Sequence, residues 1–326
     1  MNNTIKLFVD EKSIGKRLDR FLADNINEYT RSFIKKLIED KQVRLNNTLL
    51  LSPSTKVKYN DQIIINIFEK NFQNVSPKKI KLNIIYEDKD ILVINKPKGM
   101  VVHPGAGNNK DTLVNALLFK YKKNLSNING ALRPGIVHRI DKETSGLLVV
   151  AKNNLAHSNL GNQFSKHTIK RKYLCLSWGV VRPLKGTINT LITRDKKNRQ
   201  LMTVSDVNGK KAITNYKTIK VFNIKDIPKI SLLECELETG RTHQIRVHLK
   251  YKGTSLLGDK QYGKKNIKFK KINNDFFTKL NKLTGQALHA KTLEFVHPKT
   301  KKWVSFNSDL PDSFKKMLNL LENMDS

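Results

Sequence analysis

The chain has 326 residues, with 61 Lys and Arg against 28 Asp and Glu, which gives a formal net charge of +33. This length favours more than one domain, and a strongly basic balance indicates a polyanionic partner such as a nucleic acid. Two cysteines without metal-type spacing argue against a disulfide framework. Because no long apolar run marks a leader or a membrane helix, we expect a cytoplasmic protein with reduced thiols.

The positive charge is unevenly distributed along the chain. Residues 1–70 contain 13 Lys and Arg against 9 Asp and Glu, whereas residues 71–326 contain 48 against 19. Lysine is abundant throughout, together with Asn and Ile, so part of this excess reflects general composition. The charge supports nucleic-acid binding, mainly by the larger C-terminal part, but does not identify the partner.

The first predicted unit spans residues 15–67. Apolar residues recur with helical spacing in residues 18–22 and again in residues 30–40, where Thr30 or Ser32 is available as the cap. Residues 43–46 and 63–67 have the composition of strands, and Asn46 and Asn47 form a turn signal between them. We therefore expect a small α+β module.

Several positions of this unit follow a known motif: Gly15, Arg17, Leu18, Asp19, Val43 and Asn46. On these residues the unit resembles the S4-type RNA-binding module. Asn47 and Asn60 replace expected glycines, but Asn tolerates the positive φ of such turns. The Arg31-Ser32 pair also departs from the family order. The resemblance implies RNA contacts by Lys16, Arg17, Arg20, Arg31, Lys35 and Lys36, and ordinary solvated helix faces are the alternative.

Residues 68–80 are polar and aperiodic and include Pro77, so we expect a linker. A second domain is predicted for residues 81–315, with a hairpin at residues 84–95, a helix at 154–166 and strands at 171–176 and 230–237. Residues 316–326 are predicted to be a C-terminal tail. Residues 264–282 are rich in lysine with interleaved phenylalanine, which suits either an RNA contact or a loose insertion.

The most informative stretch is residues 138–152. Asp141 lies between Arg139 and Lys142 and precedes the apolar run of residues 147–151, which is typical of a buried strand. Neighbouring cations favour the charged form of a carboxylate, which suits a nucleophile or a base better than an acid. An ordinary surface ion pair is the alternative interpretation of Asp141.

This stretch resembles the signature of the RluA-type pseudouridine synthases. Residues 95–104, 171–173, 239–248 and 258–263 resemble further segments of that family, and the likeness extends over residues 15–67 and 80–315. The resemblance implies an α+β catalytic domain whose mixed, largely antiparallel sheet bends around a basic cleft. The matching signature positions are His138, Arg139, Asp141, Thr144, Ser145, Gly146, Leu147, Leu148, Ala151 and Lys152.

The resemblance also implies roles for individual residues. Asp141 would either attack C1′ of the ribose or remove its 2′ hydrogen, and the sequence does not choose between these routes. Tyr173 would stack on the flipped base, with core packing as its alternative, and Arg241 would be the cation against Asp141. RNA contacts are expected from His138, Arg139 and Thr144. His243 and His248 are closely spaced, but no nearby ligand completes a metal site, so no metal is expected.

The implied reaction converts uridine to pseudouridine within RNA and consumes nothing, so no cofactor is expected. The runs at residues 103–107 and 133–138 are most similar to the RluD-like branch, which favours large-subunit ribosomal RNA as the partner. Another ribosomal or transfer RNA uridine, as in RluC-like enzymes, is the nearest alternative. A non-catalytic ribosome-assembly factor is the alternative from another class. A monomer is the default expectation.

Overall fold

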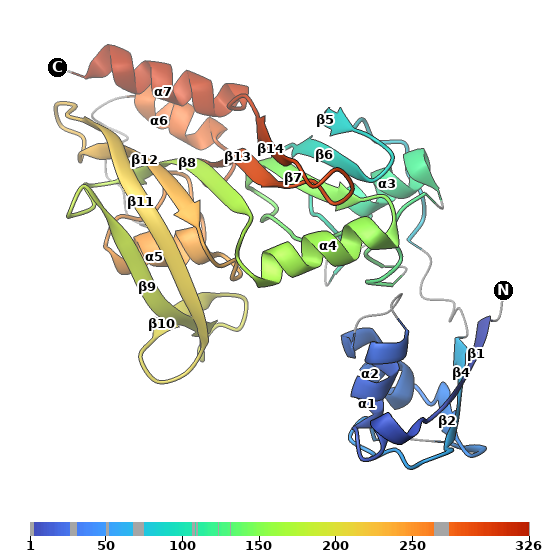
Figure 1. Ribbon diagram of the computed structural model, residues 1–326. Helices are drawn as coiled ribbons and strands as arrows, with labels where there is room; N and C mark the ends of the chain where they lie inside the picture. Colours follow the sequence, from blue (N-terminus) through green and yellow to red (C-terminus); the bar gives the residue numbers. More distant parts are fainter. Residues whose placement is uncertain are drawn as a thin grey trace.

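The structure is a computed structural model that describes residues 3–26, 31–49, 52–67, 75–105, 108, 110–122, 124–130, 132–263 and 274–325. These residues form two bodies, each with its own sheet and core (Figure 1). The predicted cap at Thr30, most of the predicted linker and residues 264–273 lie outside the described residues. Across the described ranges, no helix has the length and apolar composition needed to cross a membrane.

The N-terminal body contains the two predicted helices, α1 (Leu18–Asn25) and α2 (Arg31–Glu39), and a short 3-10 helix (Glu11–Ser13). Their apolar residues, such as Leu18, Phe21 and Ile38, are buried against an antiparallel sheet of order β1-β4-β2-β3. As predicted, Asn47 and Asn60 have positive φ, 65° and 61°. The strands are β1 (Asn3–Phe8), β2 (Val43–Leu45), β3 (Thr48–Leu49) and β4 (Gln62–Ile67).

This body begins earlier than the expected boundary at residue 15. Strand β1 pairs antiparallel with β4 along its whole length, from Asn3 opposite Ile67 to Phe8 opposite Gln62. Residues 3–8 are not predicted as a strand because only Ile5 and Leu7 alternate with polar residues, and so short a pattern is a weak strand signal. Pairing with β4, which is far away in sequence, decides that it folds with this module.

The larger body is an α+β domain around a sheet of ten strands in the order β10-β9-β11-β12-β8-β13-β7-β6-β5, with β14 paired to β13. Within the described ranges the pairing is antiparallel except between β13 and β7, so the predicted mixed, largely antiparallel sheet is confirmed. The strands are β5 (Ile84–Glu87), β6 (Ile91–Lys96), β7 (Ser145–Ala151), β8 (Lys170–Trp178), β9 (Lys185–Arg194), β10 (Met202–Ser205), β11 (Lys210–Phe222), β12 (Ile230–Leu237), β13 (Leu288–Val296) and β14 (Trp303–Asn307).

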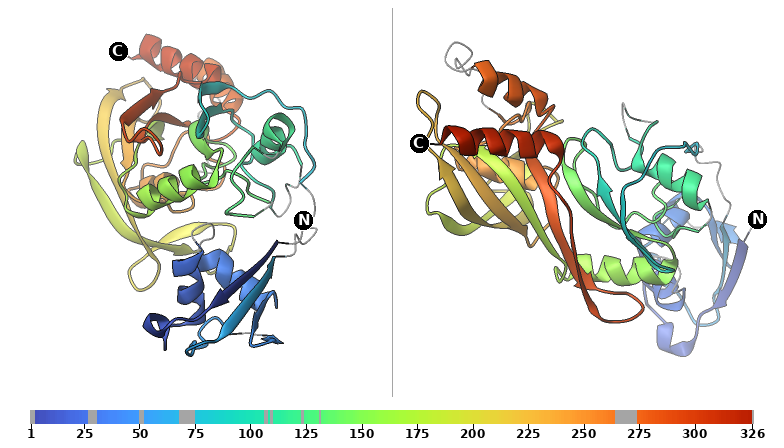
Figure 2. Two further views of the ribbon diagram at one scale, coloured as in Figure 1. Left: turned by 45° about the vertical axis from the view of Figure 1, so that its right-hand side comes forward. Right: turned by 90° about the horizontal axis from the view of Figure 1, so that it is seen from above.

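Strand β7 explains the unbroken apolar run that follows Asp141. Leu148 and Val150 pack towards α3 (Leu113–Tyr121), whereas Leu147 and Val149 pack towards α4 (Asn154–Ser165). Because successive residues of a strand face opposite sides, a strand covered on both faces must be apolar at every position. Figure 2 shows the two helices on either side of this part of the sheet. The loop that carries Asp141 therefore leads into a strand that is buried at every position.

The C-terminal end is a helix rather than the predicted tail. Helix α7 (Asp312–Met324) packs beside α6 (Asn274–Lys282) and buries Met317, Leu320 and Leu321 in a second core. Each such side chain contributes about 1.5–3 kcal/mol of burial free energy. The boundary expected at residue 315 therefore falls inside a helix. Phe276 of α6 is also buried, so this half of the lysine-rich segment is folded and not a loose insertion.

One glycine fixes the start of β7 against β13. Gly146 has a φ of +114°, and a Cβ there would lie 2.3 Å from the carbonyl oxygen of Ala290. The close approach places the Ser145 hydroxyl 2.9 Å from Nδ1 of His289, and both side chains are buried. The loop that carries Asp141 is therefore tied to the centre of the sheet at its C-terminal end.

Candidate active site

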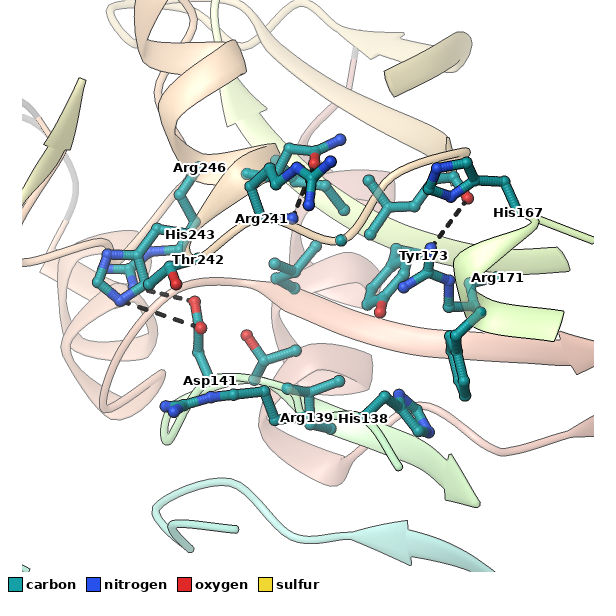
Figure 3. A pocket seen from close by; sticks show the side chains of 18 of the residues that line it. His138, Arg139, Asp141, His167, Arg171, Tyr173, Arg241, Thr242, His243 and Arg246 are labelled. Atoms are coloured by element: carbon teal, nitrogen blue, oxygen red, sulfur yellow. Dashed lines mark hydrogen bonds and ion pairs between the residues drawn. The ribbon is translucent and has the colours of Figure 1, made fainter. Parts of the chain in front are cut away.

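Three segments that are far apart in sequence line one cavity of about 480 Å³. They are the loop before β7, the end of α4 with the start of β8, and the turn between β12 and α5 (Gln244–Tyr251). Figure 3 shows the labelled side chains of these segments around the cavity. The segments chosen from the sequence thus meet at one place, and of the described residues that line it, Asp141 is the one acid.

A buried lysine holds the loop that carries Asp141. Lys96 is fully buried, and its Nζ donates to the carbonyl oxygens of Pro97 and Met100 at 2.8 Å and of Lys142 at 3.2 Å. Burial lowers the pKa of Lys96 to about 7. Lys96 lies in residues 95–104, which resemble a family motif, but the sequence predicts no role for it. Its contacts to three carbonyl groups fix the backbone next to Asp141.

His138 and Thr144 line the cavity, and one polar atom of each side chain is hydrogen-bonded within the protein. The Nε2 atom of His138 accepts from the backbone N–H of Val149 at 3.0 Å, and burial lowers the pKa of His138 to about 3. The Thr144 hydroxyl accepts from Nε2 of Gln286 at 3.0 Å. Both residues therefore brace the loop. Their expected RNA contacts stay a prediction.

The expected cation partner of Asp141 was wrong. Arg246, not Arg241, donates from Nη1 to Oδ2 of Asp141 at 3.1 Å (Figure 3). Arg241 instead donates from Nε to the backbone oxygen of Lys211 at 2.9 Å. The reason is position: Arg241 lies in the turn before α5, whereas Arg246 lies in the first turn of the helix and reaches across to the loop.

Arg246 is held in place by a second carboxylate. Asp259 accepts from Nε at 2.7 Å and from Nη2 at 2.9 Å, and Gln261 accepts from Nη2 at 2.7 Å. Although burial opposes the charged form, the Arg246 guanidinium keeps the pKa of Asp259 below its usual value. A forked contact of this kind fixes the plane of the guanidinium. Arg246 therefore presents Nη1 to Asp141 in a defined direction.

The turn before α5 is organised by Gln244. Oε1 of Gln244 accepts from the backbone N–H of Arg241 at 3.0 Å and from the Thr239 hydroxyl at 2.8 Å. The helix follows His243, which has a left-handed φ of 57°. The conformation lets the chain turn sharply and brings His243 beside Asp141.

Strand β8 supplies one wall of the cavity. Arg171 and Tyr173 are two residues apart and therefore lie on the same face of the strand, and both are buried at the cavity wall. Burial raises the pKa of Tyr173, so its phenol is protonated at neutral pH. The Arg171 guanidinium lies over the Phe164 ring at 5.4 Å. Sequence reasoning selected Tyr173 and missed Arg171, although strand periodicity could have found it.

Arg139 is exposed and stands between this cavity and a neighbouring one of about 530 Å³. Its Nη1 lies 3.5 Å from Nε2 of His103, a buried ring. Burial, with the cationic Arg133 and Arg139 nearby, lowers the pKa of His103 to about 4. The neutral ring can therefore accept from the guanidinium. The second cavity has a basic lining that includes Lys142, Lys260 and Arg246.

In the N-terminal body, two of the expected RNA-contact residues share one buried carboxylate. Arg17 and Arg31 are each about half exposed and donate to Asp19, at 3.1 Å and 3.0 Å. Although burial opposes the charged form, these two cations keep the pKa of Asp19 below its usual value. Arg20 is exposed, and Lys16 and Lys35 approach Asp24 and Glu39 at 4.0 Å and 3.7 Å. Lys36 lies in α2, but its side chain is outside the described residues.

The two closely spaced histidines have separate environments. His248 is buried, with Nδ1 2.8 Å from the Thr214 hydroxyl and Nε2 3.1 Å from the Thr190 hydroxyl. His243 faces Asp141 instead, with Nε2 3.9 Å from Oδ1. In the described part of the chain, no group of three or more His, Cys, Asp or Glu side chains is arranged to hold a metal ion.

Taken together, the cavity presents one carboxylate among cations, next to a protonated phenol. Such a carboxylate can act as a nucleophile or a base on a ligand whose negative charge the surrounding arginines bind. Hydrolysis of a glycosidic bond would normally use a pair of carboxylates. No second acid is among the described residues that line this cavity.

Known proteins are similar to this chain over nearly its whole length. Residues 90–251 match the model of the RNA pseudouridylate synthase family, and residues 16–63 match the S4 domain. An RNA pseudouridine synthase of Bacillus subtilis, YlyB, is 43% identical over 99% of this chain and 98% of its own length. The ribosomal large subunit pseudouridine synthase D of Zymomonas mobilis is 43% identical over 98% of each chain. The solved structure of human RNA pseudouridylate synthase domain containing 4 has a TM-score of 0.57 and 26% identity, over 74% of this chain and 93% of that one.

Proposed function

Since this chain belongs to the RNA pseudouridylate synthase family, we propose that it isomerises specific uridines of large-subunit ribosomal RNA, with Asp141 as the catalytic carboxylate. The observation that supports this role is the position of Asp141, which faces a cavity beside Tyr173 while Arg246 holds its Oδ2 atom. The partner is proposed from the relatives named ribosomal large subunit pseudouridine synthase D.

In this reaction the C1′–N1 bond breaks, the uracil turns within the site and C5 bonds to C1′, while the hydrogen on C5 is lost and a proton is gained at N1. Asp141 either attacks C1′ or removes the 2′ hydrogen. Arg246 orients the carboxylate for both routes through a charged hydrogen bond to Oδ2. An enzyme that orients its reacting group in advance lowers the barrier without further reorganisation.

Tyr173 is proposed to stack on the flipped uracil. Its ring forms part of the cavity wall, and the raised pKa makes the neutral phenol the resting form. A flipped base needs such an aromatic face because it has lost the stacking of its neighbours. Arg171 lies on the same wall and is available to an anionic oxygen of the nucleotide.

Arg139 is proposed to contact the RNA beside the flipped nucleotide. It is exposed and lines both cavities, so it stands where a strand entering the site would pass. The basic lining on both sides would bind the phosphate backbone, which supplies affinity but no sequence information.

The decisive experiment is a map of pseudouridine in total RNA from cells that carry either the wild-type chain or Asp141→Asn as their only copy. We expect loss of discrete sites in large-subunit RNA with the variant. Loss of sites in another RNA instead would contradict the proposed partner, and an unchanged map would contradict the catalytic role of Asp141 unless a second enzyme covers the same sites. Purified protein on a transcript separates these two explanations.

A further inference from the structure

We infer that His243 and Tyr262 form a positioning pair that fixes Oδ1 of Asp141, and that this pair connects the carboxylate to strand β10. The inference rests on the proposed catalytic role of Asp141. Arg246 contacts Oδ2, and the ring of His243 faces the other oxygen with its Nε2 at 3.9 Å (Figure 3). Arg246 and His243 therefore approach different oxygen atoms of the Asp141 carboxylate.

The hydrogen-bond pattern favours one tautomer of His243. The backbone N–H of Met202 in β10 donates to the hydroxyl oxygen of Tyr262 at 2.7 Å. The hydroxyl proton of Tyr262 is then available for Nδ1 of His243, which lies 2.8 Å away. If Nδ1 accepts, the proton of the neutral ring is on Nε2, the atom that faces Asp141. The chain of donors thus runs from Met202 through Tyr262 and His243 to the carboxylate.

The protonation states of His243 and Tyr262 agree with a hydrogen-bond chain that runs from Met202 to Asp141. Burial lowers the pKa of His243, although Asp141 opposes the shift, so the neutral ring prevails at neutral pH. Burial raises the pKa of Tyr262, so its hydroxyl keeps the proton that it donates. A neutral Nε2–H donor can orient Oδ1 without neutralising the negative charge of the carboxylate.

The backbone and packing hold the pair in place. His243 has a left-handed φ of 57°, which points its ring back from the start of α5 towards the loop of Asp141. The ring of Tyr262 is buried with Ile192 and Val247, and the Arg246 guanidinium lies over it at 4.8 Å. Tyr262 thus contacts both groups that approach Asp141. The separation of 3.9 Å is longer than a hydrogen bond, and such contacts commonly shorten when the substrate binds.

Strand β10 connects the His243–Tyr262 pair to a basic hairpin. It is the edge strand beside β9, and the turn between them carries Lys196, Lys197 and Arg199, all exposed. These cations are placed to meet an RNA backbone next to the cavity. RNA that binds this hairpin could therefore shift the Met202 amide and, through its hydrogen bond, the Tyr262 hydroxyl. A shift of that hydroxyl would change the orientation of His243.

The test is a double-mutant cycle of Tyr262→Phe and His243→Asn. Tyr262→Phe removes one oxygen and keeps the buried ring, and Asn tolerates the left-handed backbone at residue 243 but is too short to reach Asp141. We expect Tyr262→Phe to lower kcat about 3- to 10-fold, the value of one hydrogen bond, with unchanged affinity for RNA. Because the two residues act as a unit, the double variant should be no slower than His243→Asn alone.

Tyr216→Phe is the matched control. Tyr216 is also buried, and its hydroxyl donates to the backbone oxygen of Pro183 at 3.0 Å, away from the cavity. It should leave kcat unchanged. Wild-type kcat in Tyr262→Phe, losses that multiply in the double variant, or a loss confined to RNA affinity would each overturn the positioning role. Asp141→Asn is assayed in parallel: if it stays active, the proposed function fails, whereas an inactive Asp141→Asn with unaffected Tyr262→Phe removes the pair alone.

Discussion

Asp19 with its two arginines and Asp141 with Arg246 are ion pairs in which opposite partners are buried. In the N-terminal module the Asp19 carboxylate is buried, with 5% of its side chain exposed, and it holds Arg17 and Arg31, which are 50% and 54% exposed. In the cavity Arg246 is the buried partner, at 5%, and Asp141 is the more exposed one, at 18%. The module therefore presents cations to its surroundings, whereas the cavity presents a carboxylate.

This difference explains how one kind of ion pair serves two purposes. The buried partner is fixed by packing and hydrogen bonds, and it orients the exposed partner, which is left to meet a ligand. In the module the exposed groups suit the phosphates of RNA. In the cavity the more exposed group is the carboxylate that we propose acts on the ribose of a flipped nucleotide.

The largest effect is expected from Arg246→Gln. It removes the charge that faces Asp141 and leaves the fully buried Asp259 carboxylate without its cation. We expect a loss of about 3–5 kcal/mol in the free energy of unfolding, as for a broken buried pair, together with loss of turnover. Chemical denaturation and a single-turnover assay measure the two effects. Arg246→Lys keeps a charge but cannot form the fork, so it should recover part of the stability and little of the activity. Stability equal to the wild type in Arg246→Gln would contradict this description of the buried partner.

The second prediction is that the stability of the two bodies depends differently on pH. Five histidines of the larger body have a pKa lowered to about 4 or below, chiefly by burial, whereas residues 1–70 contain no histidine. Below a pH of about 6.5 the unfolded chain binds more protons at these sites than the folded chain. The free energy of unfolding should therefore fall from about pH 6.5 to pH 4, by up to about 1.4 kcal/mol per pH unit for each histidine.

Hydrogen exchange at pH 7 and pH 5, corrected for the intrinsic rate, can follow both bodies in the intact chain. Protection should fall in the larger body and change little in the module. The lowered pKa values of Asp19 and Asp259 act at lower pH, because their stabilisation is present above about pH 4 and is lost as pH falls further. His157→Gln should reduce the pH dependence of the larger body. An equal loss of protection in both bodies is the result that this prediction does not allow.

The third prediction concerns Asp19→Asn. The change removes the charged acceptor of Arg17 and Arg31, so we expect a loss of about 1–3 kcal/mol in stability and weaker RNA binding, with kcat at saturating RNA unchanged. Denaturation and RNA titration measure these effects. Glu39→Gln is the matched control, because Glu39 pairs with Lys35 at 3.7 Å on the exposed face of α2 and such pairs contribute little. A lower kcat in Asp19→Asn would show that the two bodies do not act separately.

The smallest effect is expected from Arg20→Ala on the exposed face of α1. If Arg20 contacts one phosphate of a single-stranded segment, the slope of log affinity against log salt should decrease by about 0.7, with kcat unchanged. Binding measured at several salt concentrations tests this. Lys316→Ala, on the exposed face of α7, is the control and should leave the slope unchanged. Identical slopes for Arg20→Ala and the wild type would exclude Arg20 from the RNA contact.

Most local elements could be predicted because their signals are local. The strand from Ile230 to Leu237, the helix after Asn153 and the buried strand after Asp141 are in the structure where periodicity placed them. Errors arose where partners are distant in sequence. Strand β1 depends on pairing with β4. Helix α7 is amphipathic, but the prediction for residues 316–326 is a tail, because its apolar stripe is explained only by packing against the second core.

For the site, the three motifs, the carboxylate of Asp141 and the aromatic ring of Tyr173 could be selected from the sequence alone, because each lies in a short run of residues. Only the tertiary structure decided that Arg246 rather than Arg241 holds Asp141, that Lys96 braces the loop, and that His243 faces the second carboxylate oxygen. The physical reason is that a charged pair forms where two backbones bring the groups within about 3 Å, and that distance is set by the start of α5 and its packing on the sheet. Neighbouring arginines in one motif are alike in charge, and the direction of the helix decides which of them reaches the carboxylate.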